Sequence, residues 1–146
     1  MNEHETQGRI LSDLRKALRP KMSTVEIDYF MQDIKFTSTK YPGDFSIIDV
    51  IFYQQWKVHI HDFKQYFSGD AGGIAGLGFG CGSGYLYTDD IEKLFRETKT
   101  FYWFSAEIVY YSIYFLGEKS KLLGHFQAYG GAPSVGGTGG GSGSWK

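Results

Sequence analysis

The sequence is poor in the features on which several classes of protein depend. Its single cysteine, Cys81, excludes an intramolecular disulfide framework and any zinc site built from several cysteines. No apolar stretch approaches the roughly 18 residues of a membrane-spanning helix. Positive and negative side chains nearly balance, at 15 and 16, and give a formal net charge of -1 at pH 7. No basic field indicates a nucleic acid partner, and we expect none.

A secretory signal is also missing from the chain as given. Its first ten residues, MNEHETQGRI, contain acidic residues where a signal peptide has a basic end followed by an apolar run. We therefore expect synthesis in the cytoplasm and, if the protein is exported, a route that is independent of a signal peptide.

Aromatic residues, by contrast, are abundant. They make up 18% of the 146 residues, while Leu, Lys and Glu are too few for a helical bundle. This composition favours strands, and the length fits one domain with one hydrophobic core. We therefore predict an all-β fold.

The N-terminal segment departs from this pattern. Apolar side chains recur there at helical spacing beside basic ones, and the pattern ends at Pro20. The apolar stripe consists of Ile10, Leu11, Leu14, Ala17 and Leu18, and the basic residues are Arg9, Arg15, Lys16 and Arg19. We expect residues 1–21 to form an amphipathic helical or disordered segment, dispensable for folding, and residues 22–146 to form the β-barrel domain. The helix would pack on that domain or, alternatively, bind a membrane surface or a partner.

Alternating apolar and polar residues predict most of the strands. The alternation begins at Val25, slips in phase near Gln32, and is followed by a predicted turn at residues 41–44. Further strands are expected in residues 45–53, 56–63, 100–115 and 121–129, the third of these being two aromatic strands or one long bent strand. One short helix is expected at residues 89–97, with Thr88 or Asp89 as its N-cap.

The stretch GLGFGCGSG, residues 76–84, has glycine at every second position. In a flexible linker the glycines fall at odd and even positions alike, so their strict alternation here indicates a strand. One face of this strand carries only glycines and is therefore bare of side chains. A shift of 59 residues lays residues 45–84 over residues 104–143 without a gap. The matches include Phe45 with Phe104, Ser46 with Ser105, Val50 with Val109, and four alternating glycines from Gly78 to Gly84. We infer two similar halves, each ending in a glycine strand.

So many glycines in strands must serve packing, because each costs about 0.5–1 kcal/mol relative to alanine. In a small barrel the narrow interior needs small residues opposite large aromatic ones. We therefore predict a compact closed antiparallel barrel of about eight strands, in two halves joined by the short helix. The expected structural glycines are Gly78, Gly80, Gly82, Gly137, Gly139 and Gly141. Alternatively, the bare face lies outside and is a flat surface for a ligand.

Three segments carry a family resemblance. GSGYLYTDDIEKLF (residues 82–95), LLGHFQAYGG (122–131) and GTGGGSGSW (137–145) resemble the virulence-associated (Vap) proteins of pathogenic actinobacteria, over about residues 45–145. The resemblance implies an eight-stranded antiparallel barrel of two Greek-key-like halves with one short helix. It also implies a secreted host-interaction factor that favours survival inside phagocytes, in at least one member by disturbing the endolysosomal compartment. No enzymatic activity or ligand site defines the family, so no catalytic residues carry over.

The residues themselves contain no catalytic or phosphate-binding motif. The glycines do not form G-x-G-x-x-G, and Cys81 has no basic neighbour, so a packed thiol is favoured over a reactive one. His59 and His61 share a strand face and could hold a metal with Asp49 or His125, but two ligands do not make a site. We therefore predict a solvated polar face there, and expect no enzymatic activity, no metal and no cofactor.

Two kinds of binding function remain. The first is a non-enzymatic host-interaction barrel that acts on a host protein or a membrane surface. The second is a carrier or lectin-like barrel that binds a small ligand or a glycan through exposed tyrosines. The candidate tyrosines are Tyr85, Tyr87, Tyr110 and Tyr129. A packed barrel interior would favour the first function, and an empty cavity the second.

Overall fold

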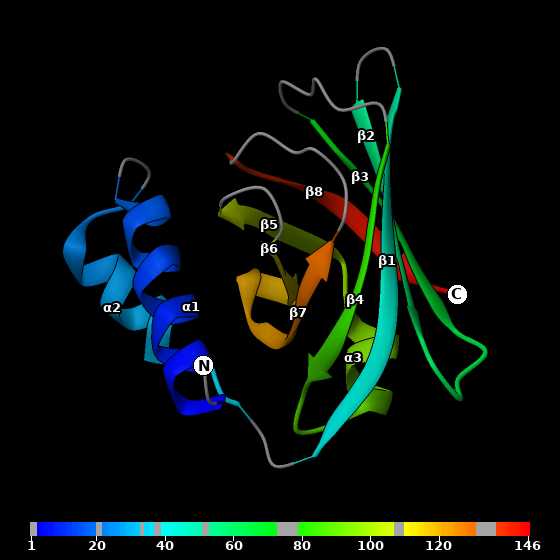
Figure 1. Ribbon diagram of the computed structural model, residues 1–146, viewed down its shortest axis with the longest axis horizontal. Coiled ribbons are helices and arrows are strands. Elements are labelled where there is room, and N and C mark those ends of the chain that lie inside the picture. Colours follow the sequence, from blue (N-terminus) through cyan, green and yellow to red (C-terminus); the bar gives the residue numbers. More distant parts are fainter. Residues whose placement is uncertain are drawn as a thin grey trace.

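The protein is a closed barrel of eight antiparallel strands with its helices outside the barrel (Figure 1). This computed structural model describes residues 3–19, 22–32, 34–36, 39–50, 53–72, 79–106, 110–130 and 137–146. The strands are β1 (Lys40–Val50), β2 (Tyr53–Ile60), β3 (Tyr66–Ala71), β4 (Phe79–Tyr87), β5 (Thr100–Ala106), β6 (Tyr110–Leu116), β7 (Leu122–Gly130) and β8 (Gly137–Trp145). The helices are α1 (Glu3–Leu18), α2 (Thr24–Gln32) and α3 (Ile91–Glu97), with a 3-10 turn at Glu118–Ser120. The predicted β-barrel is confirmed.

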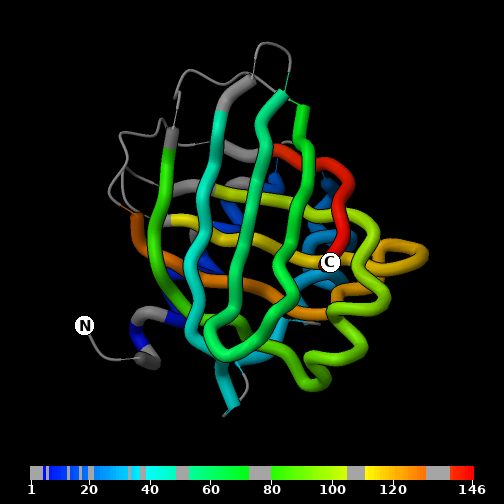
Figure 2. The backbone as a smooth tube through the Cα atoms, turned by 90° about the vertical axis from the view of Figure 1, so that its right-hand side faces the viewer, coloured from blue at the N-terminus to red at the C-terminus, as the bar shows by residue number. Residues whose placement is uncertain are grey.

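The two halves of the chain have the same strand order. Around the barrel the strands follow β1-β2-β3-β8-β5-β6-β7-β4. In the first half β1 lies between β2 and β4, with β3 beyond β2; in the second half β5 lies between β6 and β8, with β7 beyond β6. Each half is thus a Greek key. Figure 2 shows the strands of the first half upright in front of those of the second half, which cross behind them. The predicted repeat of two halves is confirmed.

The repeat is correct in its glycine strands but wrong in its Phe-Ser match. Phe45 of β1 lies opposite Gly82, and the corresponding glycine of the second half, Gly141, lies opposite Phe101. Phe45 therefore corresponds to Phe101 and not to Phe104. Because side chains alternate between the two faces of a strand, Phe104 lies outside the interior cluster to which Phe45 and Phe101 belong. Strand pairing, and not chance identity, decides which residues are equivalent.

Large aromatic side chains fill the interior of the barrel. The ring of Trp56, which is fully buried, lies 5.2 Å from that of Trp103 and 6.1 Å from that of Phe101, centroid to centroid. This cluster also contains the rings of Phe45, Phe67, Tyr111, Phe115 and Phe126, each at most 3% exposed, and those of Phe95 and Trp145, each 8% exposed. The interior is therefore a packed core.

The bare face of the glycine strands points into this core. A Cβ atom added to Gly82 would lie 2.6 Å from the ring of Phe45, and one added to Gly139 would lie 2.7 Å from Nε1 of Trp103. The alternative of a bare outer face is therefore wrong. Gly80 is also buried and Gly141 is half-buried. Gly78 lies outside the described residues, and of Gly137 only its place at the start of β8 is described.

A helix, α2, occupies residues for which the sequence predicted a strand from Val25 onward. Ser23, just before the helix, and Glu26, in its first turn, form a capping box, in which Ser23 Oγ accepts from Glu26 N at 3.2 Å and Glu26 Oε1 accepts from Ser23 N at 3.3 Å. These two bonds satisfy amide groups that the start of a helix leaves unpaired. The capping box therefore outweighs the strand preference of Val25, Ile27 and Tyr29.

The turn predicted at residues 41–44 is also wrong, because β1 runs straight through it. Gly43 pairs with Ile60 on one side and Gly84 on the other. A Cβ atom on Gly43 would lie 2.6 Å from the carbonyl oxygen of His59. The glycine therefore serves the close approach of neighbouring strands and not a change of chain direction.

The short helix α3 has a different N-cap from the one predicted. Asp90 is the cap, and its side chain accepts from Lys93 N at 3.1 Å. Thr88 instead donates its hydroxyl to the carbonyl of Leu123 at 2.8 Å, which ties the end of β4 to the start of β7. The predicted cap at Thr88 or Asp89 is therefore wrong by one or two residues.

The helices α1 and α2 form a pair on the outer face of the second half. Leu14 and Leu18 of α1 are buried with residues of α2, of the following segment and of β6, namely Ile27, Ile34 and Tyr114. Arg15 joins the two helices through an ion pair with Asp28 at 2.6 Å. Among the described residues, none of the helices combines the length and apolar character that a membrane span requires. That residues 1–21 can be removed without loss of the fold stays a prediction.

Candidate functional site

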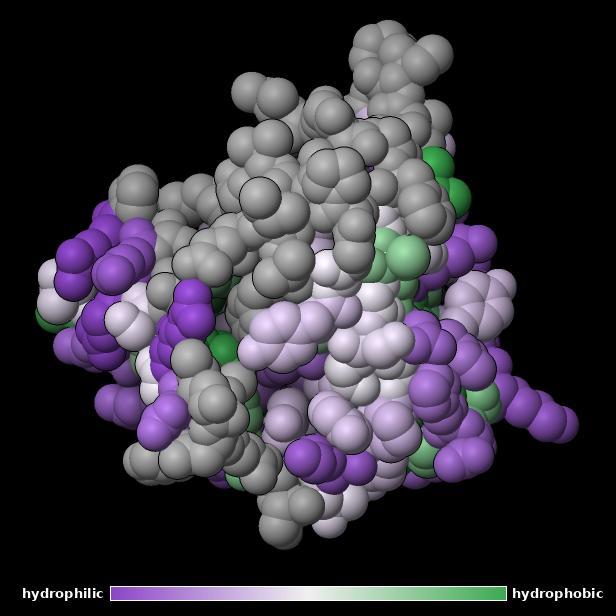
Figure 3. All heavy atoms as spheres, in the orientation of Figure 1, coloured by the Kyte–Doolittle hydropathy of each residue, from purple (hydrophilic) through white to green (hydrophobic). Residues whose placement is uncertain are grey.

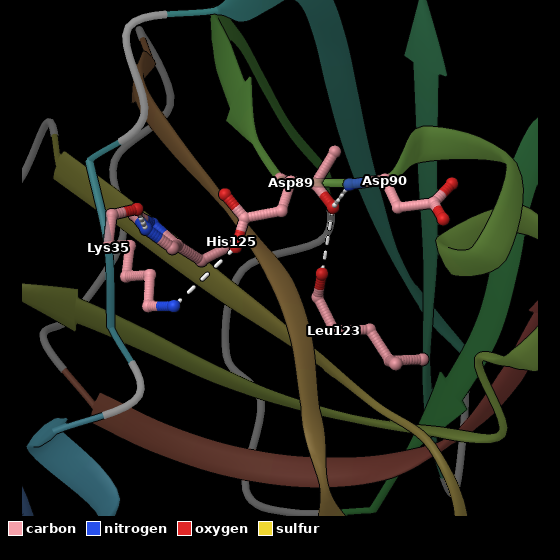
Figure 4. Close-up of polar contacts among 6 residues, drawn as sticks. Lys35, Asp89, Asp90, Leu123 and His125 are labelled. Atoms are coloured by element: carbon pink, nitrogen blue, oxygen red, sulfur yellow. Dashed lines mark hydrogen bonds and ion pairs between the residues drawn. The ribbon is translucent and has the colours of Figure 1, made fainter.

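A cavity of about 340 Å³ opens where three parts of the chain meet at one end of the barrel. These parts are the segment 34–36 that links α2 to β1, the loop from β4 to α3, and the start of β7 (Figure 4). The charged residues that line it are Lys35, Asp89, Asp90, Lys93 and Lys121. His125 forms part of its wall.

The His125 side chain is held by hydrogen bonds at both ring nitrogens. Its Nε2 lies 2.8 Å from the carbonyl oxygen of Lys35, and its Nδ1 lies 2.9 Å from the amide nitrogen of Gln127. The hydroxyl of Ser112 donates to the other end of the Gln127 amide at 2.6 Å. Because the Gln127 nitrogen is a donor, Nδ1 accepts and the proton of the neutral ring is assigned to Nε2, which donates to Lys35.

Aromatic rings enclose the same histidine. Tyr87 and Tyr114 stack on it, with centroids 5.2 and 5.9 Å away, and Phe36 meets it edge-on at 5.0 Å. This burial lowers the pKa of His125 to about 4, against the opposing effect of the hydrogen bond to Lys35. Burial likewise raises the pKa of Tyr114 to about 12. Both side chains are therefore neutral at neutral pH.

The rim of the cavity is exposed and charged. Lys35 Nζ lies 3.7 Å from Asp89 Oδ2, and both side chains are about two-thirds exposed, so the pair contributes little. Asp90 is engaged as the cap of α3. Within the described residues Lys93 and Lys121 make no side-chain ion pair. The cavity therefore offers cationic groups and a tyrosine wall to a small polar molecule, and among the described residues no nucleophile beside a base.

The predicted tyrosines fall in different places. Tyr85 and Tyr129 are exposed, at 42% and 57%, on the outer faces of the neighbouring strands β4 and β7. Lys40 Nζ lies 4.5 Å from the centre of the Tyr85 ring, a cation–π contact. Tyr110 is opposite Tyr129 in the pairing of β6 with β7, but its side chain lies outside the described residues. The expectation that Tyr87 is exposed is wrong, since it is packed against His125 and lines the cavity.

A polar cluster covers the outer face of β1, β2 and β4. Asp44 accepts from the Ser83 hydroxyl at 2.6 Å and pairs with His61 Nε2 at 2.8 Å. These two bonds, that of Ser83 first, hold the pKa of Asp44 below its usual range. His59 Nε2 bonds the carbonyl of Phe63 at 3.0 Å.

No group of three metal-ligating side chains occurs in the part of the chain that the structure describes. His125 belongs to the cavity on β7 and not to the face that carries His59 and His61. The Asp49 side chain lies outside the described residues. The expected packed thiol is wrong, because Cys81 is exposed on the outer face of β4.

Sequence reasoning missed the partners of His125. Its alternation with Gln127 on one face of β7 was a signal, because two polar residues at spacing two in an aromatic strand indicate a shared polar contact. Lys35 gave no signal, since it takes part through its backbone carbonyl, 90 residues away in the sequence.

Known proteins are similar to this chain in sequence and in fold. The family model described as Rhodococcus equi virulence-associated protein matches residues 1–146. Virulence-associated protein VapB from the intracellular pathogen Rhodococcus equi is 36% identical, with a TM-score of 0.66, over 74% of this chain and 96% of that chain. VapD from the same organism is 30% identical, with a TM-score of 0.67, over 74% of this chain and 97% of that chain. A search of curated protein sequences returned no match.

Proposed function

This chain belongs to the family of Rhodococcus equi virulence-associated proteins, and we propose that it is a non-enzymatic host-interaction protein that acts from the outside of its barrel. Its target is a host partner or the endolysosomal membrane. The names of the two solved relatives support this, because both are described as virulence-associated and from an intracellular pathogen.

The packed interior is the observation that carries the proposal. Trp56, Phe67, Phe101 and Phe115 are at most 1% exposed and occupy the space in which a barrel-type carrier holds its ligand. Interiors packed in this way leave few voids larger than a water molecule. A partner or ligand is therefore held on the outer surface.

The polar clusters support a role without catalysis. In the cluster on β1 and β4, Ser83 donates directly to Asp44, so no histidine lies between the hydroxyl and the carboxylate to relay a proton. At the cavity, both nitrogens of His125 are engaged within the protein.

A second function, the binding of a small ligand or glycan, is favoured by two specific features. One is the cavity of about 340 Å³ with Lys93 and Lys121 at its rim. The other is the exposed pair Tyr85 and Tyr129, because tyrosine rings present an apolar face beside a hydroxyl. Both features lie outside the barrel interior.

The proposal is tested by feeding the purified full-length protein to cultured phagocytes and measuring the maturation of lysosomal hydrolases. We expect the wild type to impair maturation, and the double variant Tyr85→Ser/Tyr129→Ser to impair it less at an unchanged melting temperature. The matched control is Tyr53→Ser/Tyr66→Ser, which removes two tyrosines that are 42% and 41% exposed. This control should keep the wild-type effect.

Three outcomes would count against the proposal. A wild-type protein without effect on phagocytes contradicts a host interaction. An effect that is equal in both double variants contradicts a role of Tyr85 and Tyr129 in the host interaction. Calorimetric binding of a free sugar that is lost in Tyr85→Ser/Tyr129→Ser, without any effect on phagocytes, favours the second function instead.

A further inference from the structure

We propose that α1 is a membrane-binding helix stored against the barrel and released when His125 gains a proton, its partner then being an anionic lipid bilayer. This inference rests on the proposed function and deepens it by naming the membrane as the target. It concerns the outer face of the second half, where the helix pair, the segment 34–36 and the cavity meet.

The part of α1 from Arg9 onward has the pattern of a helix that lies on a membrane surface, because Arg9, Arg15 and Lys16 flank its apolar stripe. Its apolar residues Ile10, Leu14 and Leu18 are at most 4% exposed, and Leu14 and Leu18 pack in the cluster between the helices and β6. The visible surface of the helix pair is mostly hydrophilic (Figure 3), and the large apolar side chains that the pair exposes among the described residues are Val25 and Tyr29 of α2. A helix with basic residues beside an apolar stripe binds anionic lipid, at about 1 kcal/mol for each Lys or Arg near the surface. In the docked state, however, the stripe is covered.

Segment 34–36 fastens the helix pair to the barrel. Ile34 is part of the cluster between helices and barrel, and the ring of Phe36 contacts those of Tyr87 and His125. The carbonyl of Lys35 between them accepts the hydrogen bond from His125. The docked position of α1 and α2 therefore depends on the state of this histidine.

A proton on Nδ1 of His125 breaks this arrangement. The new N–H points at the Gln127 amide nitrogen, which is also a donor. If the amide reverses, its oxygen accepts from the new N–H and its nitrogen donates to the hydroxyl of Ser112, which must then turn its own proton toward another acceptor. Protonation therefore reverses the hydrogen bonds beside the ring and places a charge in a buried site.

No carboxylate contacts the ring among the described residues. The groups that face it are Gln127 on β7, Ser112 and Tyr114 on β6, Tyr87 on β4, and Lys35 and Phe36 on the linking segment. The charged side chains of Lys35 and Asp89, which also line the cavity, pair with each other at its exposed rim. A charged ring is stabilised better in water than in this site.

The direction of the pH effect follows from proton linkage. The pKa of His125 is about 4 in the docked state, against an ordinary value of 6.5, so the undocked state binds more protons between these values. Docking therefore weakens as the pH falls below 6.5, and the loss is complete below about 4. Between pH 7 and pH 5 the ratio of undocked to docked protein rises about 20-fold.

The test is co-sedimentation of the full-length protein with phosphatidylcholine vesicles, with or without phosphatidylserine, at pH 7 and pH 5. His125→Gln keeps a donor for the Lys35 carbonyl but cannot be protonated. The matched control His59→Gln makes the same substitution on the exposed face of β2, away from the helix pair.

We expect the wild type and His59→Gln to bind phosphatidylserine vesicles about 20-fold more strongly at pH 5 than at pH 7, and phosphatidylcholine vesicles at neither pH. His125→Gln should bind weakly at both. In hydrogen exchange, corrected for the intrinsic rates, α1 and α2 of the wild type should lose protection at pH 5 while β2 and β7 keep it. This measurement tests release even if His125→Gln fails to fold.

Contrary results separate the two proposals. A pH dependence that persists in His125→Gln, or helices that keep full protection at pH 5, overturns the release mechanism and leaves a membrane target standing. Helices that lose protection at pH 5 without any vesicle binding overturn the bilayer as partner. In that case the proposed function retains only its host partner.

Discussion

The first half of the barrel, β1 to β4, and the second half, β5 to β8, share a strand order but differ in their outer faces. The outer side chains of β1 and β2, among them Asp44, Lys57 and His59, are exposed. On the outer face of β6 and β7, Ser112, Tyr114 and His125 are buried beneath the helix pair and segment 34–36, whereas Tyr129 near the end of β7 is exposed. The repeat is therefore preserved where the halves form one core, and the outer face is where they diverge.

The largest expected effect tests the equivalence of the two interiors. Gly82 and Gly141 occupy corresponding positions, opposite Phe45 and Phe101. An added Cβ at either collides with backbone, with the carbonyl oxygen of Tyr129 in one case and of Asp70 in the other. We expect Gly82→Val and Gly141→Val each to destabilise by more than about 3 kcal/mol, which soluble yield and thermal unfolding will show.

The matched control for this pair is Gly140→Val. Gly140 is exposed in the same strand as Gly141, and its added Cβ would meet its nearest atom at 3.1 Å. A folded protein with a loss below about 1 kcal/mol is expected. If only one of the two interior variants is damaging, the halves are not equivalent.

The closed barrel was predictable because two sequence signals for it extend over many residues. These signals are the glycines at every second position and the high content of aromatic residues. The helix α2 was missed because its signal, the capping box of Ser23 and Glu26, consists of two side chains among strand-forming neighbours. The error at Phe104 arose because a sequence match does not specify which face of a strand a residue occupies.

The next largest effect tests the helix pair α1 and α2, which covers the outer face of the second half. Leu14 is fully buried between the helices and β6. Leu14→Ala should cost about 2–3 kcal/mol of helix docking and leave the barrel folded, because no part of the barrel interior changes. Thermal unfolding monitored by helix and by near-UV signals should then show an early loss of helix. If Leu14→Ala unfolds in a single cooperative transition at the melting temperature of the wild type, the docked helix pair adds no stability.

An intermediate effect separates inner from outer positions of the glycine strands. At Gly139 the added Cβ meets the side chain of Trp103, which can shift, so Gly139→Val should cost about 1–3 kcal/mol. Ser68→Val, on the outer face of β3, should change stability by less than about 0.5 kcal/mol. Chemical denaturation of both variants gives the comparison. Equal losses would contradict the distinction between a packed inside and a tolerant outside.

The candidate site was less predictable than the fold. The exposure of Tyr85 and Tyr129 was predictable, because the alternation of apolar and polar residues indicates which aromatic side chains lie on the outer face. His125 was considered only as a metal ligand, since its actual partner is the backbone carbonyl of Lys35. A backbone acceptor has no signature in the sequence, so this contact required the structure.

The smallest expected effect concerns a side chain on the exposed outer face of the first half. Ser83 and His61 hold the pKa of Asp44 below its usual range, so the folded state favours the ionised carboxylate. The stability this contributes is present above the ordinary pKa of 3.8 and is lost as the pH falls through the lowered value. Because the side chains of Asp44 and His61 are about half exposed, Asp44→Asn should cost less than about 1 kcal/mol at pH 7. The melting temperatures of variant and wild type should converge toward pH 3, and a difference that grows with acid would show that Asp44 stabilises the fold by other means.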